Sequence, residues 1–365
     1  MLYIMLKPVS GTCNMECDYC FYKDEAAKRQ AYDYGIMTEQ TLEQVIKKAL
    51  CFADDGCVFA YQGGEPTLAG LHFFKKSISL QKKYNKNGIF IQNVIQTNGY
   101  ALTEKWCAFF HKHHFLVGIS LDGTKAAHDR FRKTASGADT YLSIMHTIDL
   151  LKKYQVEFNI LTVVHKTTAA KITRIYENYK RNGFLYQQYI ACAEPLGESV
   201  QNNVYSLSAE EYGKFLCRLF ELWLTDLQNG HRIFIRQFDN WLNILNGFMP
   251  EACEQRGVCG IQTIIEADGS AYPCDFYVLD SYCIGNINND DMDVIFQNRK
   301  KIAFIENNYN HSEECLHCNY FHLCRGGCSR YRINGQNIYC SGYKRFFDQH
   351  YDTLSKLAKR TMFDP

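Results

Sequence analysis

Three cysteines near the N-terminus, Cys13, Cys17 and Cys20, are separated by three and two residues. Three thiolates can hold three irons of a [4Fe–4S] cubane and leave the fourth iron without a protein ligand. An open coordination position distinguishes a catalytic metal centre from a structural one. The group directly follows an apolar run and has Tyr19 before its last cysteine. This arrangement favours a catalytic cluster over a zinc site that lacks a ligand or three unrelated cysteines.

A second group of eight cysteines lies in the last third of the chain. Its members are Cys253, Cys259, Cys274, Cys315, Cys318, Cys324, Cys328 and Cys340. Eight thiolates suffice for two fully ligated [4Fe–4S] clusters, but the C-x2-C spacing is equally typical of four-cysteine zinc sites. The N-terminal group in the same chain favours iron–sulfur. The other six of the 17 cysteines are scattered, and we interpret them as small buried hydrophobic residues.

The bulk composition excludes several classes of protein. The 365 residues include 40 basic and 39 acidic side chains, which argues against a nucleic-acid binder with its usual basic excess. The sequence has no apolar run near the ~20 residues that a membrane span requires. Met1–Leu6 has no basic region typical of a signal peptide. We therefore expect a cytoplasmic protein without a membrane partner, in which clustered cysteines bind metal rather than form disulfides.

Strand-like and helix-like segments alternate through the first half of the chain. Six mostly continuous apolar runs are typical of strands buried on both faces of a parallel sheet. They are Tyr3–Lys7, Val58–Gln62, Ile89–Gln96, Leu116–Leu121, Val156–Val164 and Tyr186–Cys192. The pattern predicts an α/β fold, a partial (β/α)6 parallel barrel. Active sites of such folds collect at the carboxyl ends of the strands, where the N-terminal cysteines fall.

Helices with a 3.6-residue period separate these runs. After Thr38 as N-cap, one apolar face contains Leu42, Val45, Ile46, Ala49 and Leu50. In the helix predicted over Tyr141–Tyr154, the corresponding face contains Leu142, Met145, Ile148 and Leu151. Ser208 and Glu211 form a capping-box pattern at the start of a long helix that ends at Asn229-Gly230.

The character of the chain changes at about Pro250, where short segments, glycines and cysteines predominate. Such a loop-rich region would need metal ions or clusters to stabilise it. We therefore expect a partial-barrel domain over residues 1–230 and an iron–sulfur domain with a C-terminal helix over residues 231–365.

Polar or glycine-rich segments follow the second, third and fourth predicted strands, at Gly63–Pro66, Gln96–Gly99 and Ser120–Gly123. Glycines let the backbone approach a ligand closely, and Glu65 could accept a hydrogen bond from a ligand ammonium group. Arg132 could bind a ligand carboxylate through two hydrogen bonds. A solvated surface arginine is an equally good interpretation of Arg132.

The cysteine group and Gly63–Pro66, taken together, resemble the radical S-adenosylmethionine (SAM) family, in which the Gly-Gly-Glu-Pro segment binds the SAM amino group. The later cysteines resemble the SPASM module of that family. This resemblance implies two auxiliary [4Fe–4S] clusters in addition to the catalytic one. Auxiliary cluster I would take Cys253, Cys259, Cys274 and Cys328, and auxiliary cluster II would take Cys315, Cys318, Cys324 and Cys340.

Over nearly its whole length the chain resembles anaerobic sulfatase-maturating enzymes. The segments that carry this resemblance are Cys20–Tyr22, Tyr61–Gly70, Val156–Leu161 and Tyr272–Asp280. The resemblance implies SAM contacts from Tyr19, Gly64, Glu65, Ser120, Arg132 and the backbone at Ala193. It also implies that Asp275 is the catalytic base. The sequence departs from the family at Ala193-Glu194-Pro195, where a leucine and an aspartate are expected before the proline.

The implied reaction oxidises a cysteine or serine of an unfolded sulfatase to Cα-formylglycine. A 5′-deoxyadenosyl radical would abstract the Cβ hydrogen, with an electron donor such as ferredoxin or flavodoxin as a second partner. One alternative is another SPASM maturase that crosslinks a precursor peptide, although the first strand begins too early for an N-terminal peptide-recognition domain. The other is an iron–sulfur electron carrier or a zinc-stabilised binding protein, neither of which would form 5′-deoxyadenosine.

Overall fold

The computed structural model describes residues 1–197, 203–260, 262–301 and 303–361. The chain forms two compact units. The first unit comprises Met1–Ser120, Asp129–Phe158 and Gly260–Phe304, and the second comprises Leu121–His128, Asn159–Cys259 and Ile305–Pro365. Each unit draws on both sides of residue 230, and the domain boundary expected there remains a prediction.

The first unit is built on a sheet whose central strands are parallel. Its strands β1 (Leu2–Leu6), β3 (Gly56–Tyr61), β4 (Phe90–Thr97) and β5 (Leu116–Ser120) are neighbours in that order. All residues of β3 are buried, as a continuous apolar run between two covered faces requires. The first four predicted strands are therefore confirmed.

Residues from the last third of the chain extend this sheet beyond β1. Strand β10 (Thr263–Ile265) pairs in parallel with β1, and β11 (Ser270–Tyr272) and β12 (Gly285–Asn286) follow in antiparallel pairing. The Lys7 amide donates to the Ile265 carbonyl at 2.9 Å, which continues the β1–β10 ladder. This pairing brings the segment that follows β11 close to the cysteine loop after β1. These three short strands were not predicted from the sequence.

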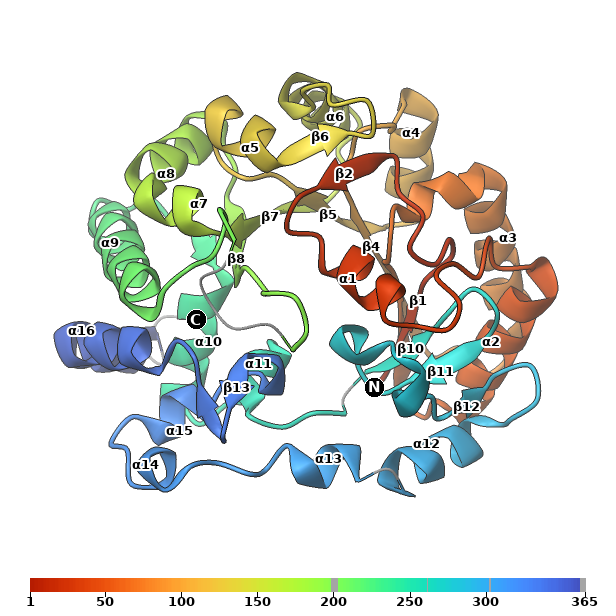
Figure 1. Cartoon of the computed structure of the whole chain (residues 1–365). Helices are drawn as coiled ribbons and strands as arrows, with labels where there is room; N and C mark the ends of the chain where they lie inside the picture. The colour runs from red at the N-terminus through yellow and green to blue at the C-terminus, as the bar shows by residue number, and fades with distance from the viewer. Residues whose placement is uncertain (198–202, 261, 302, 362–365) are drawn as a thin grey trace. The chain divides into compact units, whose positions relative to one another are not determined.

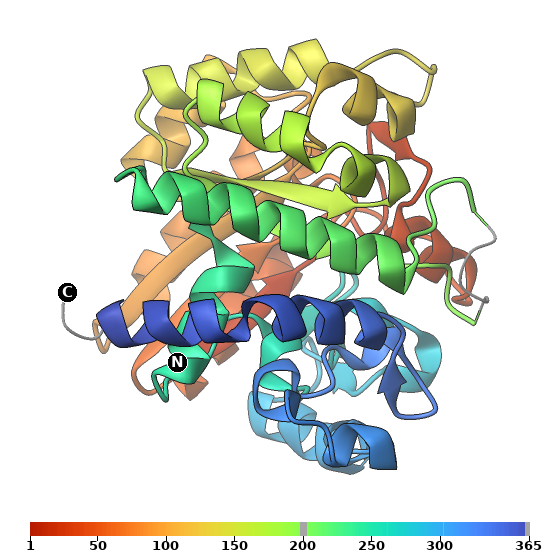
Figure 2. The same cartoon turned by 90° about the vertical axis from the view of Figure 1, so that its left-hand side faces the viewer.

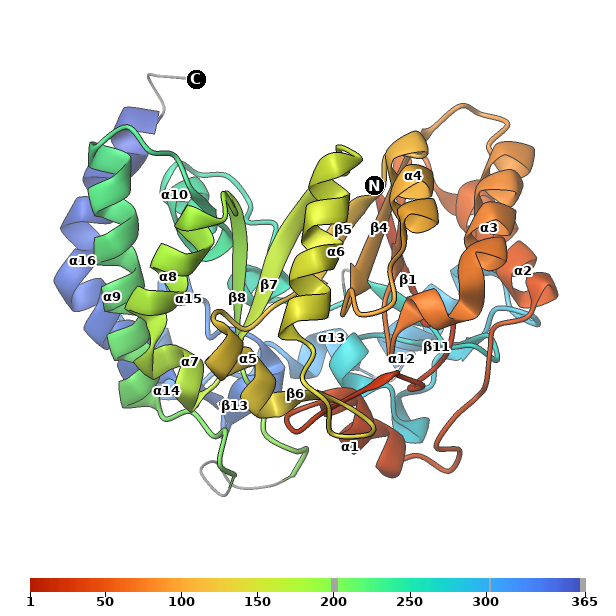
Figure 3. The same cartoon turned by 90° about the horizontal axis from the view of Figure 1, so that it is seen from above.

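Helices cover the outer side of this sheet (Figure 1). They include α2 (Glu39–Phe52), α3 (Gly70–Tyr84), α4 (Glu104–Lys112) and α6 (Tyr141–Lys153). Helices α2 and α3 lie side by side (Figure 3). The predicted N-cap is confirmed, because the Thr38 hydroxyl accepts a hydrogen bond from the Thr41 amide at 3.1 Å. The predicted apolar face of α2 is also buried.

The face predicted for α6 is wrong in part. Leu142 is 68% exposed and Met145 is only partly buried. The buried residues are Ile144, Thr147, Ile148 and Leu151. They recur at intervals of three and four residues, which defines one helical stripe, and Leu142 in the first turn lies outside it. The buried stripe includes the polar residue Thr147, so the pattern of apolar residues in the sequence did not reveal it.

The second unit contains the remaining predicted strands. The predicted strands β7 (Phe158–Val164) and β8 (Tyr186–Ala191) pair in parallel, and β9 (Phe234–Ile235), which the sequence did not predict, pairs in parallel with β8. Helix α8 (Ile172–Arg181) packs against α9 (Ala209–Gln228), whose limits match the helix predicted after Ser208.

The C-terminal helix α16 (Cys340–Thr361) confirms another prediction and lies beside α9 (Figure 2). Glycines permit the close contact between these helices, because a Cβ at Gly213 would lie 2.8 Å from the Gly342 Cα. Helix α10 (Arg236–Leu245) packs on the same helix, with the Trp241 and Phe346 rings 4.9 Å apart.

The remaining elements are short, and most follow Pro250, as the loop-rich composition predicts. The α-helices among them are α1 (Phe21–Ala27), α5 (Lys125–Phe131), α7 (Lys166–Ala170), α11 (Cys253–Arg256), α12 (Met292–Lys301), α13 (Phe304–Asn307), α14 (Glu313–Leu316) and α15 (Phe321–Cys324). The strands are β2 (Met15–Cys17), β6 (Arg132–Thr134), β13 (Arg332–Ile333) and β14 (Gln336–Asn337). The 3-10 turns are η1 (Pro66–Ala69), η2 (Asp275–Tyr277), η3 (Asp280–Tyr282) and η4 (Ser329–Tyr331). Within the described residues, no helix has the length and apolar composition needed to cross a bilayer.

The capping box of α9 yields a stability prediction. The Ser208 hydroxyl accepts a hydrogen bond from the Glu211 amide at 3.2 Å, and the Glu211 carboxylate accepts one from the Ser208 amide at 2.9 Å. Ser208→Ala should lower the free energy of unfolding by about 1 kcal/mol and the calorimetric Tm by on the order of 1–2 °C. Ser79→Ala, at an exposed position inside α3, is the control. Equal Tm values for the two variants would contradict the prediction.

Candidate active site

The N-terminal cysteines lie on a loop that secondary structure holds at both ends. Strand β2, which ends at Cys17, pairs antiparallel with β6, so that Cys17 lies opposite Arg132. Cys20 is the N-cap of α1. The Cys13 thiol accepts a hydrogen bond from the Met15 amide at 3.4 Å. All three thiols are partly exposed, as ligands of a cluster that must reach SAM should be.

The glycine segment after β3 contacts the cysteine loop directly. Gly64 has a φ of 51°, and a Cβ built on it would lie only 2.1 Å from the Thr12 carbonyl oxygen. The Glu65 amide donates a hydrogen bond to the same oxygen at 2.8 Å. Only glycine fits a contact this close. The backbone of Gly64 therefore sets the position of the residue that precedes Cys13.

The Glu65 carboxylate is buried, with 1% of the residue exposed, and is almost fully hydrogen-bonded. One oxygen accepts from the Thr67 amide at 3.1 Å, the Thr67 hydroxyl at 2.6 Å and the Thr97 hydroxyl at 2.7 Å. The other accepts from the Asn98 amide at 2.8 Å. Burial raises the pKa of Glu65. A carboxylate has about four acceptor positions, so Glu65 chiefly joins the ends of β3 and β4, and its predicted contact with the SAM ammonium group remains a prediction.

Arg132 is buried, with 6% exposed, which contradicts the interpretation as a solvated surface arginine. Its guanidinium group donates to the Cys17 sulfur at 3.8 Å and lies 5.4 Å from the centre of the Tyr19 ring. Tyr19 in turn packs edge-on against Phe131. The first unit thus places Arg132 and Tyr19 beside the cysteine loop, and their contacts with SAM remain predictions.

The other two predicted SAM contacts lie in different units. Ser120 ends β5, and its hydroxyl accepts a hydrogen bond from the Gln96 side chain at 3.1 Å. Ala193 belongs to the second unit. The backbone on both sides of it is fixed by three side chains of the iron–sulfur region. The Tyr331 hydroxyl donates a hydrogen bond to the Ala191 carbonyl at 2.6 Å, and the Tyr339 hydroxyl donates one to the Cys192 carbonyl at 3.1 Å. The Arg330 guanidinium group donates to the Glu194 carbonyl at 2.6 Å.

Asp275 begins η2, directly after Cys274, and is buried. One carboxylate oxygen, Oδ2, accepts hydrogen bonds from the Tyr22 hydroxyl at 2.6 Å and the Gln62 amide at 3.2 Å. The other oxygen, Oδ1, is also buried and has no hydrogen-bond partner among the described residues. Burial raises the pKa of Asp275. An orphaned buried carboxylate oxygen is costly unless a ligand uses it.

Sequence reasoning missed the roles of Tyr22 and Gln62. Tyr22 lies in the first turn of α1, two residues after Cys20, and Gln62 directly precedes Gly63. Gln62 also donates to the Tyr22 hydroxyl at 2.8 Å, so the two side chains orient each other. Both belong to segments that carry the family resemblance, and this position beside two motifs was the signal that could have identified them.

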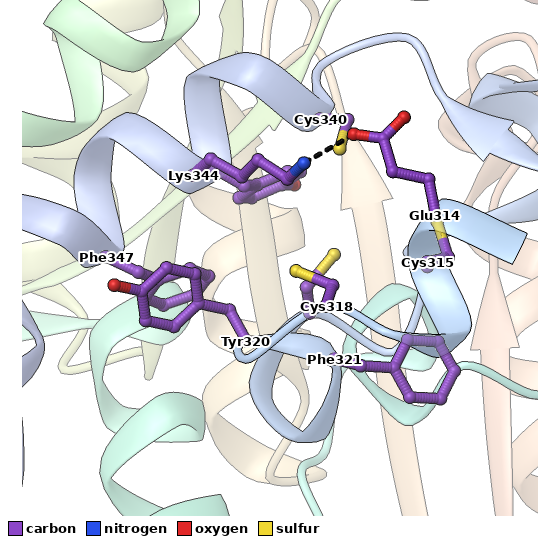
Figure 4. Close-up of a pocket in the computed structure, with 11 residues that line it drawn as sticks. Glu314, Cys315, Cys318, Tyr320, Phe321, Cys340, Lys344 and Phe347 are labelled. Carbon is purple, nitrogen blue, oxygen red and sulfur yellow. Dashed lines mark hydrogen bonds and ion pairs between the residues drawn. The ribbon is translucent and has the colours of Figure 1, made fainter.

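Four cysteines of the second unit surround one cavity (Figure 4). They are the ligands predicted for auxiliary cluster II, namely Cys315, Cys318, Cys324 and Cys340. Burial, together with the neighbouring thiols, raises the pKa of Cys324 to about 12. The Lys344–Glu314 ion pair, at 2.5 Å, lies at the edge of this cavity. Four thiols around one cavity fit a cluster that is bound through all its irons.

The residues predicted to bind auxiliary cluster I come from both units. Cys253, Cys259 and Cys328 belong to the second unit, whereas Cys274 belongs to the first. Burial raises the pKa of Cys328, and the nearby Cys259 and Cys253 thiols raise it further, which indicates that these three are neighbours. Within the described parts of the chain, no three His, Cys, Asp or Glu side chains are arranged to hold a single metal ion.

Comparison with known proteins agrees with this geometry. Residues 8–178 match the radical SAM superfamily, and residues 257–319 match an iron–sulfur cluster-binding domain. A cysteine-type anaerobic sulfatase-maturating enzyme of Clostridium novyi is 42% identical and aligns over 98% of this chain and 97% of its own length. A serine-type anaerobic sulfatase-maturating enzyme of Bacteroides thetaiotaomicron is 31% identical and aligns over 100% of this chain and 92% of its own length. The solved structure of native anSMEcpe with bound AdoMet and Cp18Cys peptide has a TM-score of 0.94 and 41% identity over 99% of both chains.

The fold, with its two matched domains, is that of a radical SAM enzyme with a C-terminal iron–sulfur domain. The α/β fold class predicted from the sequence is thereby confirmed. Within this class, the chain belongs to the anaerobic sulfatase-maturating enzymes, as its identity to relatives over nearly their full length shows.

The contact between Gly64 and Thr12 makes a prediction about SAM binding. Gly64→Ala should weaken SAM binding at least ~10-fold, because the added Cβ displaces the cysteine loop. A tenfold loss of affinity corresponds to about 1.4 kcal/mol, which is within the usual cost of local backbone strain. Gly70→Ala is the matched control, since Gly70 also has positive φ (81°) but no atom lies within 4 Å of the place that its Cβ would take. SAM affinity is measured by anaerobic equilibrium dialysis. Equal affinity of the two variants would show that the Thr12 contact does not position the site.

Proposed function

We propose that this enzyme oxidises a cysteine side chain in an unfolded sulfatase to Cα-formylglycine. Membership of the sulfatase-maturating family supports this reaction. The higher identity to a cysteine-type relative (42%) than to a serine-type relative (31%) favours cysteine as the target. The observation that carries the proposal is the buried Asp275 carboxylate, which is hydrogen-bonded to Tyr22 of α1 and whose Oδ1 has no hydrogen-bond partner among the residues that the structure describes.

The cofactors in this proposal are SAM and three [4Fe–4S] clusters. When bound, SAM and the N-terminal cluster supply the 5′-deoxyadenosyl radical that removes a Cβ hydrogen, and auxiliary cluster I supplies an acceptor for the second electron. The N-terminal ligands are Cys13, Cys17 and Cys20. The auxiliary ligands are Cys253, Cys259, Cys274 and Cys328 for cluster I, and Cys315, Cys318, Cys324 and Cys340 for cluster II.

Asp275 removes the proton from the substrate sulfur. Its Oδ1 has a free acceptor position, whereas Tyr22 and Gln62 hold Oδ2 and thereby fix the plane of the carboxylate. A base must lie within hydrogen-bond reach of the proton that it takes. Loss of one Cβ hydrogen atom, one proton and one electron converts the cysteine to a thioaldehyde. Water then replaces sulfur to give the aldehyde and hydrogen sulfide.

Two features of the cellular setting belong to the proposal. Cleavage of SAM consumes an electron, which a carrier such as ferredoxin or flavodoxin supplies. We also propose a cytoplasmic location, because cysteines that ligate clusters must stay reduced before the clusters are assembled.

The three-cluster assignment predicts an iron count. After anaerobic reconstitution the protein should contain about twelve irons per chain, at four irons per cubane. Elemental analysis measures iron and zinc in the same sample. Stoichiometric zinc together with about four irons would instead assign the eight C-terminal cysteines to zinc sites.

The proton-transfer role is tested with Asp275→Asn, which keeps the shape of the side chain and removes its basicity. Formylglycine formation should fall by ~10²–10⁴-fold, the usual contribution of a general base. Cleavage of SAM does not use Asp275, so 5′-deoxyadenosine should still form at least in part. Both yields are measured by mass spectrometry after anaerobic incubation with SAM, a reductant and a cysteine-containing sulfatase peptide.

Asp280→Asn is the matched control, because Asp280 is exposed and its side chain accepts a hydrogen bond from the Gln30 amide at 2.8 Å. This control should keep wild-type yields of both products. If Asp275→Asn forms formylglycine at the wild-type level, Asp275 does not take the proton and has only a structural role. If the wild-type enzyme forms deoxyadenosine but no formylglycine with any sulfatase peptide, the proposed substrate is wrong.

A further inference from the structure

Asn98, the first residue after β4, contacts the cysteine loop although the proposed reaction gives it no role. Its side-chain amide nitrogen, Nδ2, lies 3.6 Å from the Cys13 sulfur and 2.8 Å from the Asn14 side-chain oxygen. The residue is buried, with 8% exposed. A buried amide donor therefore faces one of the three thiols that are proposed to bind the N-terminal cluster.

The hydrogen bonds of Asn98 fix which end of its amide faces the sulfur. The Asn98 side-chain oxygen accepts from the Tyr100 backbone amide at 2.9 Å, a contact that the NH2 end could not make. The Asn98 backbone amide donates to Glu65 at 2.8 Å. The donor thus points to Cys13, and Glu65 anchors the backbone from which it projects.

A hydrogen bond to a cluster thiolate withdraws negative charge from sulfur. Reduction adds an electron to the cluster, so donors to its sulfurs stabilise the reduced state and raise the reduction potential. Cys13 accepts two such contacts, one from the Met15 backbone at 3.4 Å and one from Asn98. The Met15 donor is a backbone amide, which is present whatever side chain stands at position 15. The Asn98 donor belongs to the side chain and is lost when the residue is replaced.

We propose that Asn98 is a positioning residue of the SAM-cleaving cluster, whose hydrogen bond to Cys13 raises the reduction potential of that cluster. The inference rests on the N-terminal cluster of the proposed function and is independent of the substrate that is oxidised. The Gln96–Gly99 segment, which ends β4, would then also help to control the reduction of the cluster.

The experiment is a redox titration of reconstituted enzyme without SAM, followed by electron paramagnetic resonance. The signal that changes when SAM is added in a separate sample identifies the N-terminal cluster among the three. Asn98→Ala should shift the potential of this signal to more negative values. Asn98→Asp, which keeps the shape but replaces the donor with a carboxylate, should shift it further in the same direction.

Asn93→Ala is the matched control, because Asn93 is a buried asparagine within β4 whose side chain pairs with Gln81 instead. Its potential should equal that of the wild type. A wild-type potential in Asn98→Ala would overturn the proposal. Loss of the SAM-sensitive signal from both Asn98 variants, with Asn93→Ala intact, would also overturn it, because Asn98 would then be needed for assembly. A wild-type enzyme without any SAM-sensitive signal would contradict the N-terminal cluster itself.

Discussion

The close approach of the Gly64 backbone to the Thr12 carbonyl is the constraint on which the site depends. A Cβ at Gly64 would lie 2.1 Å from that oxygen, so the two segments can meet only if residue 64 is glycine. Because β1 and β3 are parallel neighbours, their carboxyl ends lie at the same edge of the sheet. The cysteine loop after β1 therefore contacts the glycine segment after β3. Glu65 and Asn98 extend the contact to β4, so that three strands hold one loop.

Two buried carboxylates of the first unit show how the same group serves different purposes. Burial raises the pKa of both Glu65 and Asp275. Glu65 accepts four hydrogen bonds, three on one oxygen and one on the other, and these bonds hold the ends of β3 and β4 together. Asp275 accepts two on one oxygen, and within the described part of the chain no group donates to the other. The distribution of donors, more than burial, therefore distinguishes these two carboxylates.

Sequence patterns predicted the six barrel strands and the long helices because each has enough residues for its periodicity to emerge. They did not predict that β10 joins β1, since Thr263–Ile265 is too short to have a period. The α6 face was misplaced because Thr147 is buried while Leu142 is exposed. The two groups of cysteines were recognisable from their spacing, but the division of the eight C-terminal cysteines between two clusters rests on the family resemblance and remains a prediction. Tyr22 and Gln62 were missed because they act through contacts between segments distant in sequence.

The central claim is that this enzyme removes a hydrogen atom from Cβ of a substrate cysteine. The most direct test uses a sulfatase peptide whose target cysteine carries deuterium at Cβ, incubated anaerobically with the enzyme, SAM and a reductant. Mass spectrometry of the 5′-deoxyadenosine then reports whether the label has moved. We expect deoxyadenosine that contains deuterium, formed together with formylglycine. Formylglycine accompanied by unlabelled deoxyadenosine would contradict the claim.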